Sequence, residues 1–188
     1  MRQIAPLFGV SKSAADRIID QLGPLLALQP RRRFAKDTVL IVDGTLVPTA
    51  TTRSPVQELQ VLHQPPARHR YRHRLIVVVG QLLPGNRNDC RAWEKSGAKT
   101  AVGKTVTIAD GGYPGTGLVM PHRRRAGEEL PDWKQEHNRS HKRVRARVEH
   151  AFARMNNWKI LRDCRLKGDG VHHAMLGIAR LHNLTLTG

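Results

Sequence analysis

The chain has 188 residues, enough for one domain with a buried core and a small appendage. It carries 32 Lys and Arg against 15 Asp and Glu, a formal net charge of +17, so we expect a polyanionic partner and first of all nucleic acid. Its two cysteines are too few for a disulfide scaffold or a four-cysteine zinc site, and no apolar run approaches membrane-spanning length. We therefore expect a protein of the reducing cytoplasm with no membrane partner.

Residues 1–30 show the pattern of two helices separated by a glycine turn. Apolar residues recur at helical spacing on both sides of Gly9 as far as Leu22, and Ser11 is placed to cap the second helix. This is the shape of a helix-turn-helix, although an ordinary helical hairpin fits the same pattern. In the first interpretation the second helix would present these side chains to DNA: Ser11, Lys12, Ser13 and Arg17.

A complete helix-turn-helix needs at least one more packing helix, so we expect this one to be partial and to lack its N-terminal portion. A short basic segment at 31–37 is then expected to link it to one larger domain over 38–188.

Two stretches of the larger domain spell the same pattern, Thr-Val-x-Ile-x-Asp-Gly, at 38–44 and 105–111. Each is a β-branched run short enough for a buried strand, and each is expected to deliver an aspartate, Asp43 or Asp110, at the strand's tip. If the strands are neighbours in one sheet, the two carboxylates lie close enough to hold a hard divalent cation. Either Asp-Gly pair alone is more simply a turn that closes a strand. The repetition favours the shared site.

The remaining elements follow from periodicity and capping. Between the two aspartate strands we expect a strand at 75–80 and a helix that begins at Asn88 or Asp89 and runs to about Lys99. A glycine-rich basic stretch at 111–127 comes next, followed by a long helix over 131–162 and a last helix over 172–184. The expected order is strand, strand, helix, strand, helix, helix, which indicates an α/β domain.

Glu149 is a third acid, on the border of the apolar stripe of the long helix. Its ordinary role would be an ion pair with Arg145 one turn earlier, worth a few tenths of a kcal/mol. A sharper hypothesis groups it with Asp43 and Asp110. Three acids in so basic a domain are poorly suited to attract a cationic ligand, and they are better suited to hold metal against a phosphodiester.

Together these segments resemble insertion-sequence transposases of the DDE superfamily. The resemblance covers nearly the whole chain and rests on 40–45, 83–89, 108–113, 144–150 and 158–162. It implies an RNase H-like mixed sheet flanked by helices, behind a helix-turn-helix. It also implies a Mg²⁺- or Mn²⁺-dependent enzyme that cuts and joins DNA at element ends and target, works as a homo-oligomer and associates with the nucleoid.

The resemblance also assigns residues. Asp43, Asp110 and Glu149 match the catalytic metal ligands, and Arg145 matches the arginine of the signature around the family's glutamate. The tyrosine of that signature is replaced here by Lys142. The basic side chains expected to contact DNA phosphates are Arg123, Arg124, Arg125, Lys142, Arg143 and Arg145.

Residues 51–74 depart from the family pattern, which places a strand there. With suitable codons, the family peptide shifted by two bases yields the ten residues at 57–66, so we interpret the segment as the product of compensating frameshifts. The resemblance implies that the lost strand lies between the first and third strands, whose backbones would then be left unpaired. A short substitute at 59–62, limited by Pro65 and Pro66, is the expected replacement.

Two functional hypotheses remain open. The complete set of three acids favours an active transposase, whereas the altered segment favours a catalytically inactive remnant that binds DNA without cleaving it. A basic RNA-binding protein is not supported, because aromatic residues make up 4% of the chain and form no stacking platform.

Overall fold

The computed structural model describes residues 4–29, 31, 33–47, 56–64, 75–85, 88–162, 166 and 169–187, with the backbone alone at 56–64, 147, 150, 152 and 156. Its strands are β1 (Val39–Val47), β2 (Val56–Gln64), β3 (Ile76–Val79), β4 (Leu83–Pro84) and β5 (Val106–Ile108). Its helices are α1 (Ile4–Leu7), α2 (Lys12–Leu26), α3 (Asp89–Lys95), α4 (Ala98–Val102), α5 (Asp132–Asn156), α6 (Lys159–Arg162) and α7 (Gly170–Thr187). None of the described helices is long and apolar enough to cross a membrane.

The sheet has the order β3-β2-β1-β5, and β4 pairs with β2. β1 runs antiparallel to β2 and parallel to β5, with Val39 opposite Val106 and Ile41 opposite Ile108. The two copies of the repeated pattern are therefore adjacent and in the same register. This confirms that the two aspartate strands are neighbours in one sheet.

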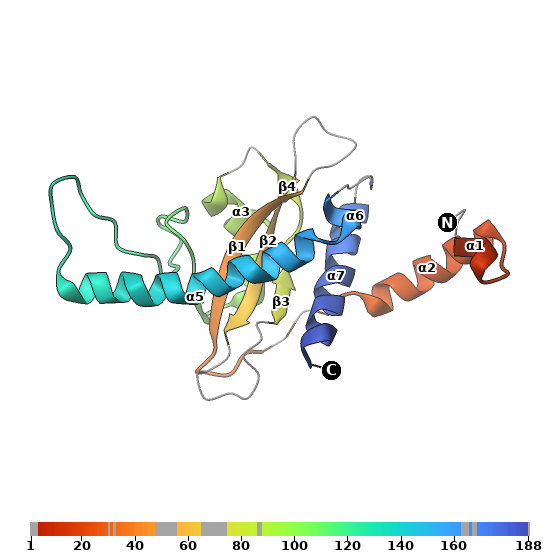
Figure 1. The fold of residues 1–188 in the computed structure, drawn as a ribbon, viewed down its shortest axis with the longest axis horizontal. Coiled ribbons are helices and arrows are strands. Elements are labelled where there is room, and N and C mark those ends of the chain that lie inside the picture. The colour runs from red at the N-terminus through yellow and green to blue at the C-terminus, as the bar shows by residue number, and fades with distance from the viewer. Residues whose placement is uncertain are drawn as a thin grey trace.

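Helices cover both faces of the sheet. Successive side chains of β1 point to opposite faces, and the apolar ones on each face belong to a separate core. Ile41 packs on one face with Val148 of α5 and Met175 of α7. Leu40 packs on the other face with Trp93 of α3. Figure 1 shows α5 crossing the sheet, with α7 beside it. The expectation of an α/β domain with a mixed sheet is confirmed, and an RNase H-like topology stays a prediction.

A strand fills the gap between β1 and β3, where the short substitute at 59–62 was expected, but it is longer than expected. β2 pairs with β1 along nine residues, from Val56 opposite Val47 to Gln64 opposite Val39, and its other edge pairs with β3. No Gly or Pro interrupts 56–64, and Pro55 and Pro65 bound it. Without β2, the facing edges of β1 and β3 would have unpaired buried backbone groups, which are costly. An uninterrupted segment of this length can pair with both edges, and 56–64 does so.

The N-terminal segment forms two helices around Gly9, as expected. The Ser11 hydroxyl accepts a hydrogen bond from the Ala14 N–H at 3.1 Å and caps α2. This helix continues past the predicted end at Leu22, with Pro24 in its last turn. A helix-turn-helix function for α1 and α2 stays a prediction.

In Figure 1, α2 projects away from the sheet and is joined to it through α7. Just beyond the end of α2, the Leu28 N–H donates to the carbonyl of Leu176 at 3.1 Å. The guanidinium of Arg180 donates to the carbonyl of Leu25 at 3.2 Å.

Two predicted helices are interrupted in the structure. Asn88 caps α3, its side chain accepting from the Arg91 N–H at 3.0 Å, but α3 ends at Lys95 instead of near Lys99. Gly97, with a φ of 81°, then begins the separate helix α4, because this left-handed conformation favours glycine. The helix predicted over 131–162 is likewise divided into α5 and α6.

The sheet predicts the effect of a proline in β2. Val61 lies opposite both Val42 of β1 and Val78 of β3, so Val61→Pro should remove a ladder donor from an interior strand and leave a buried partner unpaired, at a cost of about 1–3 kcal/mol. We expect the thermal midpoint to fall by roughly 2–12 °C. Gln64→Pro, at the end of the strand, is the matched control and should cost much less. Equal midpoints for the two variants would show that 56–64 does not form an interior strand.

Candidate active site

Asp43 lies inside β1, directly opposite Gln60 of β2. The strand continues to Val47, so the expectation that Asp43 stands at a strand tip before a turn is wrong, because pairing with β2 carries the strand past Gly44. Asp43 shares the face of Ile41, which is the face covered by α5. Its side chain accepts a hydrogen bond from the Gly44 N–H at 3.0 Å.

Asp110 follows the end of β5 and begins a turn, as its Asp-Gly sequence predicts. One carboxylate oxygen, Oδ1, accepts a hydrogen bond from the N–H of Gly112 at 2.8 Å. The other oxygen, Oδ2, faces helix α5, where it meets Arg145.

Arg145 on α5 connects the two aspartates. Its Nη2 lies 3.3 Å from Asp43 Oδ2 and its Nη1 lies 3.5 Å from Asp110 Oδ2, so one guanidinium bridges both carboxylates. The side chains of Arg145 and Asp43 are 19% exposed and that of Asp110 is 35% exposed, so the charges are only partly screened by solvent. The two carboxylates are thus arranged around one shared positive charge.

Burial and the charge of Arg145 shift the pKa of the Asp43 carboxyl in opposite directions. Burial raises the pKa of its carboxyl above the ordinary value, and the neighbouring charge of Asp110 raises it further. The Arg145 guanidinium and the hydrogen bond from Gly44 lower this pKa, but they do not outweigh burial. Arg145 therefore offsets part of the cost of holding two acids close together.

Glu149 is exposed on α5, one turn beyond Arg145. The expected ion pair between them is not formed, because the guanidinium reaches the two aspartates instead. Within the described ranges, no three His, Cys, Asp or Glu side chains gather closely enough to hold a metal ion. The structure thus brings Asp43 and Asp110 together, and the role of Glu149 as a third ligand stays a prediction.

Two further residues adjoin the aspartates and were not expected to do so. Asp89 at the start of α3 lies against Gly112, beside Asp110, and Tyr113 is a buried neighbour of these acids. From the sequence we expected Asp89 only as an alternative cap of this helix, and Asn88 is the cap in the structure. No spacing in the sequence shows that the start of α3 and the turn after β5 meet.

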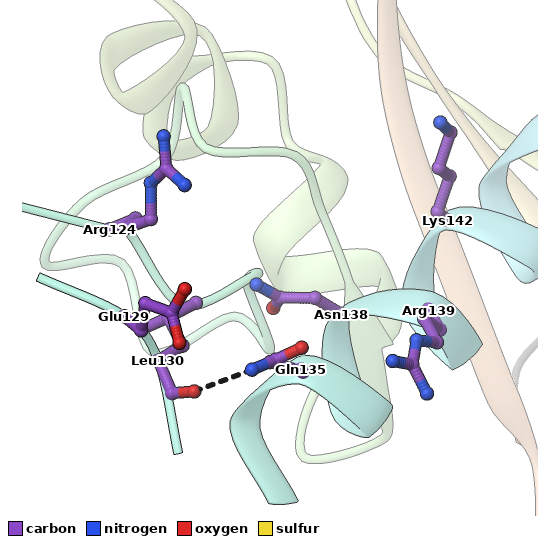
Figure 2. A pocket seen from close by; sticks show the side chains of 7 residues that line it. All are labelled: Arg124, Glu129, Leu130, Gln135, Asn138, Arg139 and Lys142. Atoms are coloured by element: carbon purple, nitrogen blue, oxygen red, sulfur yellow. Dashed lines mark hydrogen bonds between the residues drawn. The ribbon is translucent and has the colours of Figure 1, made fainter. Parts of the chain in front are cut away.

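The predicted DNA-contacting residues fall into separate places. Arg124 and Lys142 line one pocket of about 380 Å³ between the loop after β5 and helix α5, together with Glu129, Leu130, Gln135, Asn138 and Arg139 (Figure 2). Arg123 donates to the carbonyl of Gly111 at 2.9 Å, whereas Arg125 and Arg143 are exposed. Ser11, Lys12, Ser13 and Arg17 are exposed on the α2 segment, which Figure 1 shows on the other side of the sheet from this loop.

The bridge predicts a specific loss of stability when Arg145 is removed. Arg145→Met should leave two adjacent, half-buried carboxylates unpaired and lower the free energy of unfolding at neutral pH by about 1–3 kcal/mol. Without the guanidinium, the pKa of Asp43 rises further above its unfolded value. The folded state then binds a proton more readily than the unfolded state, so the variant should regain stability as the pH falls through that raised pKa.

Denaturant titrations of Arg145→Met at several pH values, beside the exposed control Arg143→Met, measure this effect. Equal stability of the two variants at neutral pH would contradict a stabilising bridge.

Comparisons with known proteins give the family. The family described as Transposase DDE domain matches residues 34–184. The chain is 74% identical over 193 aligned residues to the "Putative transposase for insertion sequence element IS112" of Streptomyces albus G, an alignment that covers 100% of this chain and 75% of that protein. No solved structure matches. The chain belongs to the insertion-sequence transposases of the DDE superfamily.

Proposed function

We propose that this transposase cuts and joins DNA strands at the ends of an insertion sequence, using Mg²⁺ or Mn²⁺ held by Asp43, Asp110 and Glu149. The observation that carries the proposal is the convergence of Asp43 and Asp110 from adjacent strands on one cationic group, the guanidinium of Arg145. A net charge of +17 supports DNA as the substrate.

The donor set fits a divalent ion. Carboxylate oxygens are the ligands that Mg²⁺ and Mn²⁺ prefer, and two of them already surround a single positive charge. Such an ion, when bound, polarises the phosphodiester and lowers the pKa of the attacking hydroxyl group. Glu149 follows Arg145 by one turn of α5, and this spacing supports its proposed role as the third ligand.

The chain's own residues position the reaction. Asp43 is held within a paired strand and Asp110 by the hydrogen bond from Gly112, so neither carboxylate needs large rearrangement. A guanidinium released from the two carboxylates is placed to pair with an oxygen of the scissile phosphate, for which its planar donors are suited. The ion pairs of Arg145 with the two aspartates would then be replaced by an ion pair with the substrate's phosphate.

The proposed chemistry is phosphoryl transfer in two steps. In cleavage, a water oxygen forms a bond to phosphorus while the bond from phosphorus to the leaving 3′-oxygen breaks. The water gives up its proton to solvent, and the leaving oxygen takes a proton from solvent to become a 3′-hydroxyl. In strand transfer, the freed 3′-hydroxyl attacks a phosphodiester of the target in the same in-line manner, so one bond to phosphorus forms as another breaks.

Helix α5 supplies a path for the DNA strand next to this site. Asn138, Lys142, Arg145 and Glu149 follow one another at helical spacing, so they lie along one side of the helix. Figure 2 shows this side of α5 beside the pocket that holds Arg124. We infer that a strand bound at Arg145 continues past Lys142 into the pocket.

The alternative of an inactive DNA-binding remnant rested on the loss of a strand beside β1. β2 occupies that place and pairs along the whole of β1, so the carrier of Asp43 is supported on both edges. Catalysis is therefore the better proposal for this chain. We also propose an RNase H-like core, a DNA-binding role for α1 and α2, a homo-oligomeric active form and action at the nucleoid.

Cleavage should depend on Asp43 and Glu149. Asp43→Asn should reduce Mg²⁺-dependent nicking of a plasmid that carries the element's ends at least about hundredfold, because an amide cannot supply an anionic ligand. It should not unfold the protein, since it removes one of two neighbouring carboxylates. Glu149→Gln should reduce nicking to a similar extent, for the same reason. The control is Glu136→Gln on the same helix, where Glu136 pairs with Arg139 at 3.2 Å.

The nicking assay separates the two acids. Nicking by Asp43→Asn at the wild-type rate would overturn the proposed active site. If Glu149→Gln cleaves as well as Glu136→Gln, Glu149 is not the third ligand.

DNA affinity should fall steeply with salt, with a log-log slope of about −0.9 for each phosphate contacted. Lys142→Ala should make this slope shallower by about one phosphate's share. Lys95→Ala removes the same charge from α3, on the other face of the sheet, and should leave the slope unchanged. Fluorescence anisotropy of duplex DNA across a salt series gives both slopes. Equal slopes for the two variants would remove α5 as the path of the strand.

A further inference from the structure

Asp89 of α3 and Asp110 after β5 approach each other over Gly112. An added Cβ at Gly112 would lie 2.6 Å from Asp89 Oδ2 and 2.9 Å from Asp110 Oδ1. The two carboxylates therefore meet at a point that only the absence of a side chain leaves open. Asp110 thus presents Oδ2 to Arg145 on one side and Oδ1 to the side of Asp89 on the other.

A second observation points to a ligand at the same place. Tyr113 is 1% exposed, and its hydroxyl is buried without a hydrogen-bond partner in the described part of the chain. Burial raises the pKa of this phenol, and the negative charges of Asp89, Asp43 and Asp110 raise it further, so the ring lies among these three acids. A buried hydroxyl without a hydrogen-bond partner is unfavourable, and a bound polar ligand would remove that cost.

We propose that Asp89 is a further acidic residue of the active site, contributing a carboxylate to the divalent cation held by Asp43 and Asp110. The inference rests on the proposed function, which supplies the cation. Asp89 would approach the cation from the side of Asp110 that faces α3. The predicted ligand Glu149 would approach it from the side that faces α5. The two acids can therefore act together.

Two side chains must move before Asp89 can bind the cation, those of Arg145 and of Asp89 itself. The guanidinium of Arg145 holds Asp43 and Asp110, and no three described acids yet close on one point. Rotation of the Asp89 side chain toward Asp110 would bring in the third carboxylate, and Gly112 leaves room for it. A competing explanation is that Asp89 only stabilises the first turn of α3 through its negative charge.

Binding of Mn²⁺ alone to the metal-free full chain separates these explanations. Asp89→Asn should lower the Mn²⁺ affinity about tenfold or more, measured by electron paramagnetic resonance of the free ion. Asp132→Asn is the matched control, since Asp132 is also an acid in the first turn of a helix and is exposed. Its Mn²⁺ affinity should equal that of the wild type.

A glycine pair tests the same contact without touching a charge. Gly112→Ala places a methyl group between the carboxylates of Asp89 and Asp110 and should weaken Mn²⁺ binding. Gly111→Ala meets no atom within 4 Å and should leave binding unchanged. Neither glycine has a positive φ, so neither alanine strains the backbone. If Asp89→Asn fails to fold, Mn²⁺ binding by Gly112→Ala at the wild-type affinity still overturns the inference.

The outcomes distinguish this inference from the function on which it rests. If Asp43→Asn loses Mn²⁺ binding but Asp89→Asn and Gly112→Ala retain it, Asp89 is only a helix residue and the proposed function stands. If Asp43→Asn also binds Mn²⁺ like the wild type, both proposals are overturned. Weakened binding in Asp89→Asn and Gly112→Ala, with normal binding in both controls, is the result expected.

Discussion

The bridge from Arg145 to Asp43 and Asp110 is the interaction on which this site depends. The two half-buried carboxylates, one within β1 and one just beyond the parallel strand β5, repel each other, and one guanidinium from α5 offsets that repulsion. Next to the bridge, Val148 of α5, one turn beyond Arg145, packs with Ile41 of β1, so an apolar contact and the ion pairs together hold α5 against the sheet. Contacts of one short part of α5 therefore position the helix on the sheet and pair the two aspartates with a positive charge.

The same bridge suggests how the site changes when it acts. A guanidinium between two carboxylates competes with a divalent cation for the same oxygens, so we infer that binding of the cation releases Arg145. Released from the aspartates, the guanidinium would be able to pair with a phosphate oxygen of the substrate, as proposed above. A residue that neutralises the resting site would thereby become part of the substrate site without a change in backbone structure.

Local sequence signals predicted the elements and the pairing of the aspartate strands. Ser11 and Asn88 cap the helices they were expected to cap, and the repeated pattern lies in register across β1 and β5. These predictions succeeded because capping and alternation depend on neighbouring residues.

The failures concern contacts between distant segments. Only a short substitute strand at 59–62 was expected between β1 and β3, because residues 56–64 differ from the family's peptide. The backbone pairing that both neighbouring strands require extends β2 to Val56–Gln64. The extension of β1 past Asp43 follows from that pairing and was missed with it. The approach of Asp89 to Gly112 depends on how α3 docks beside β5, which no sequence spacing encodes.

Anomalous diffraction from a crystal grown with Mn²⁺ would locate the cation relative to Asp43 and Asp110. We expect an anomalous peak at about 2.1 Å from oxygens of both aspartates, with the guanidinium of Arg145 displaced from the two carboxylates. A peak elsewhere, or no peak while Arg145 still bridges the aspartates at saturating Mn²⁺, would contradict this expectation.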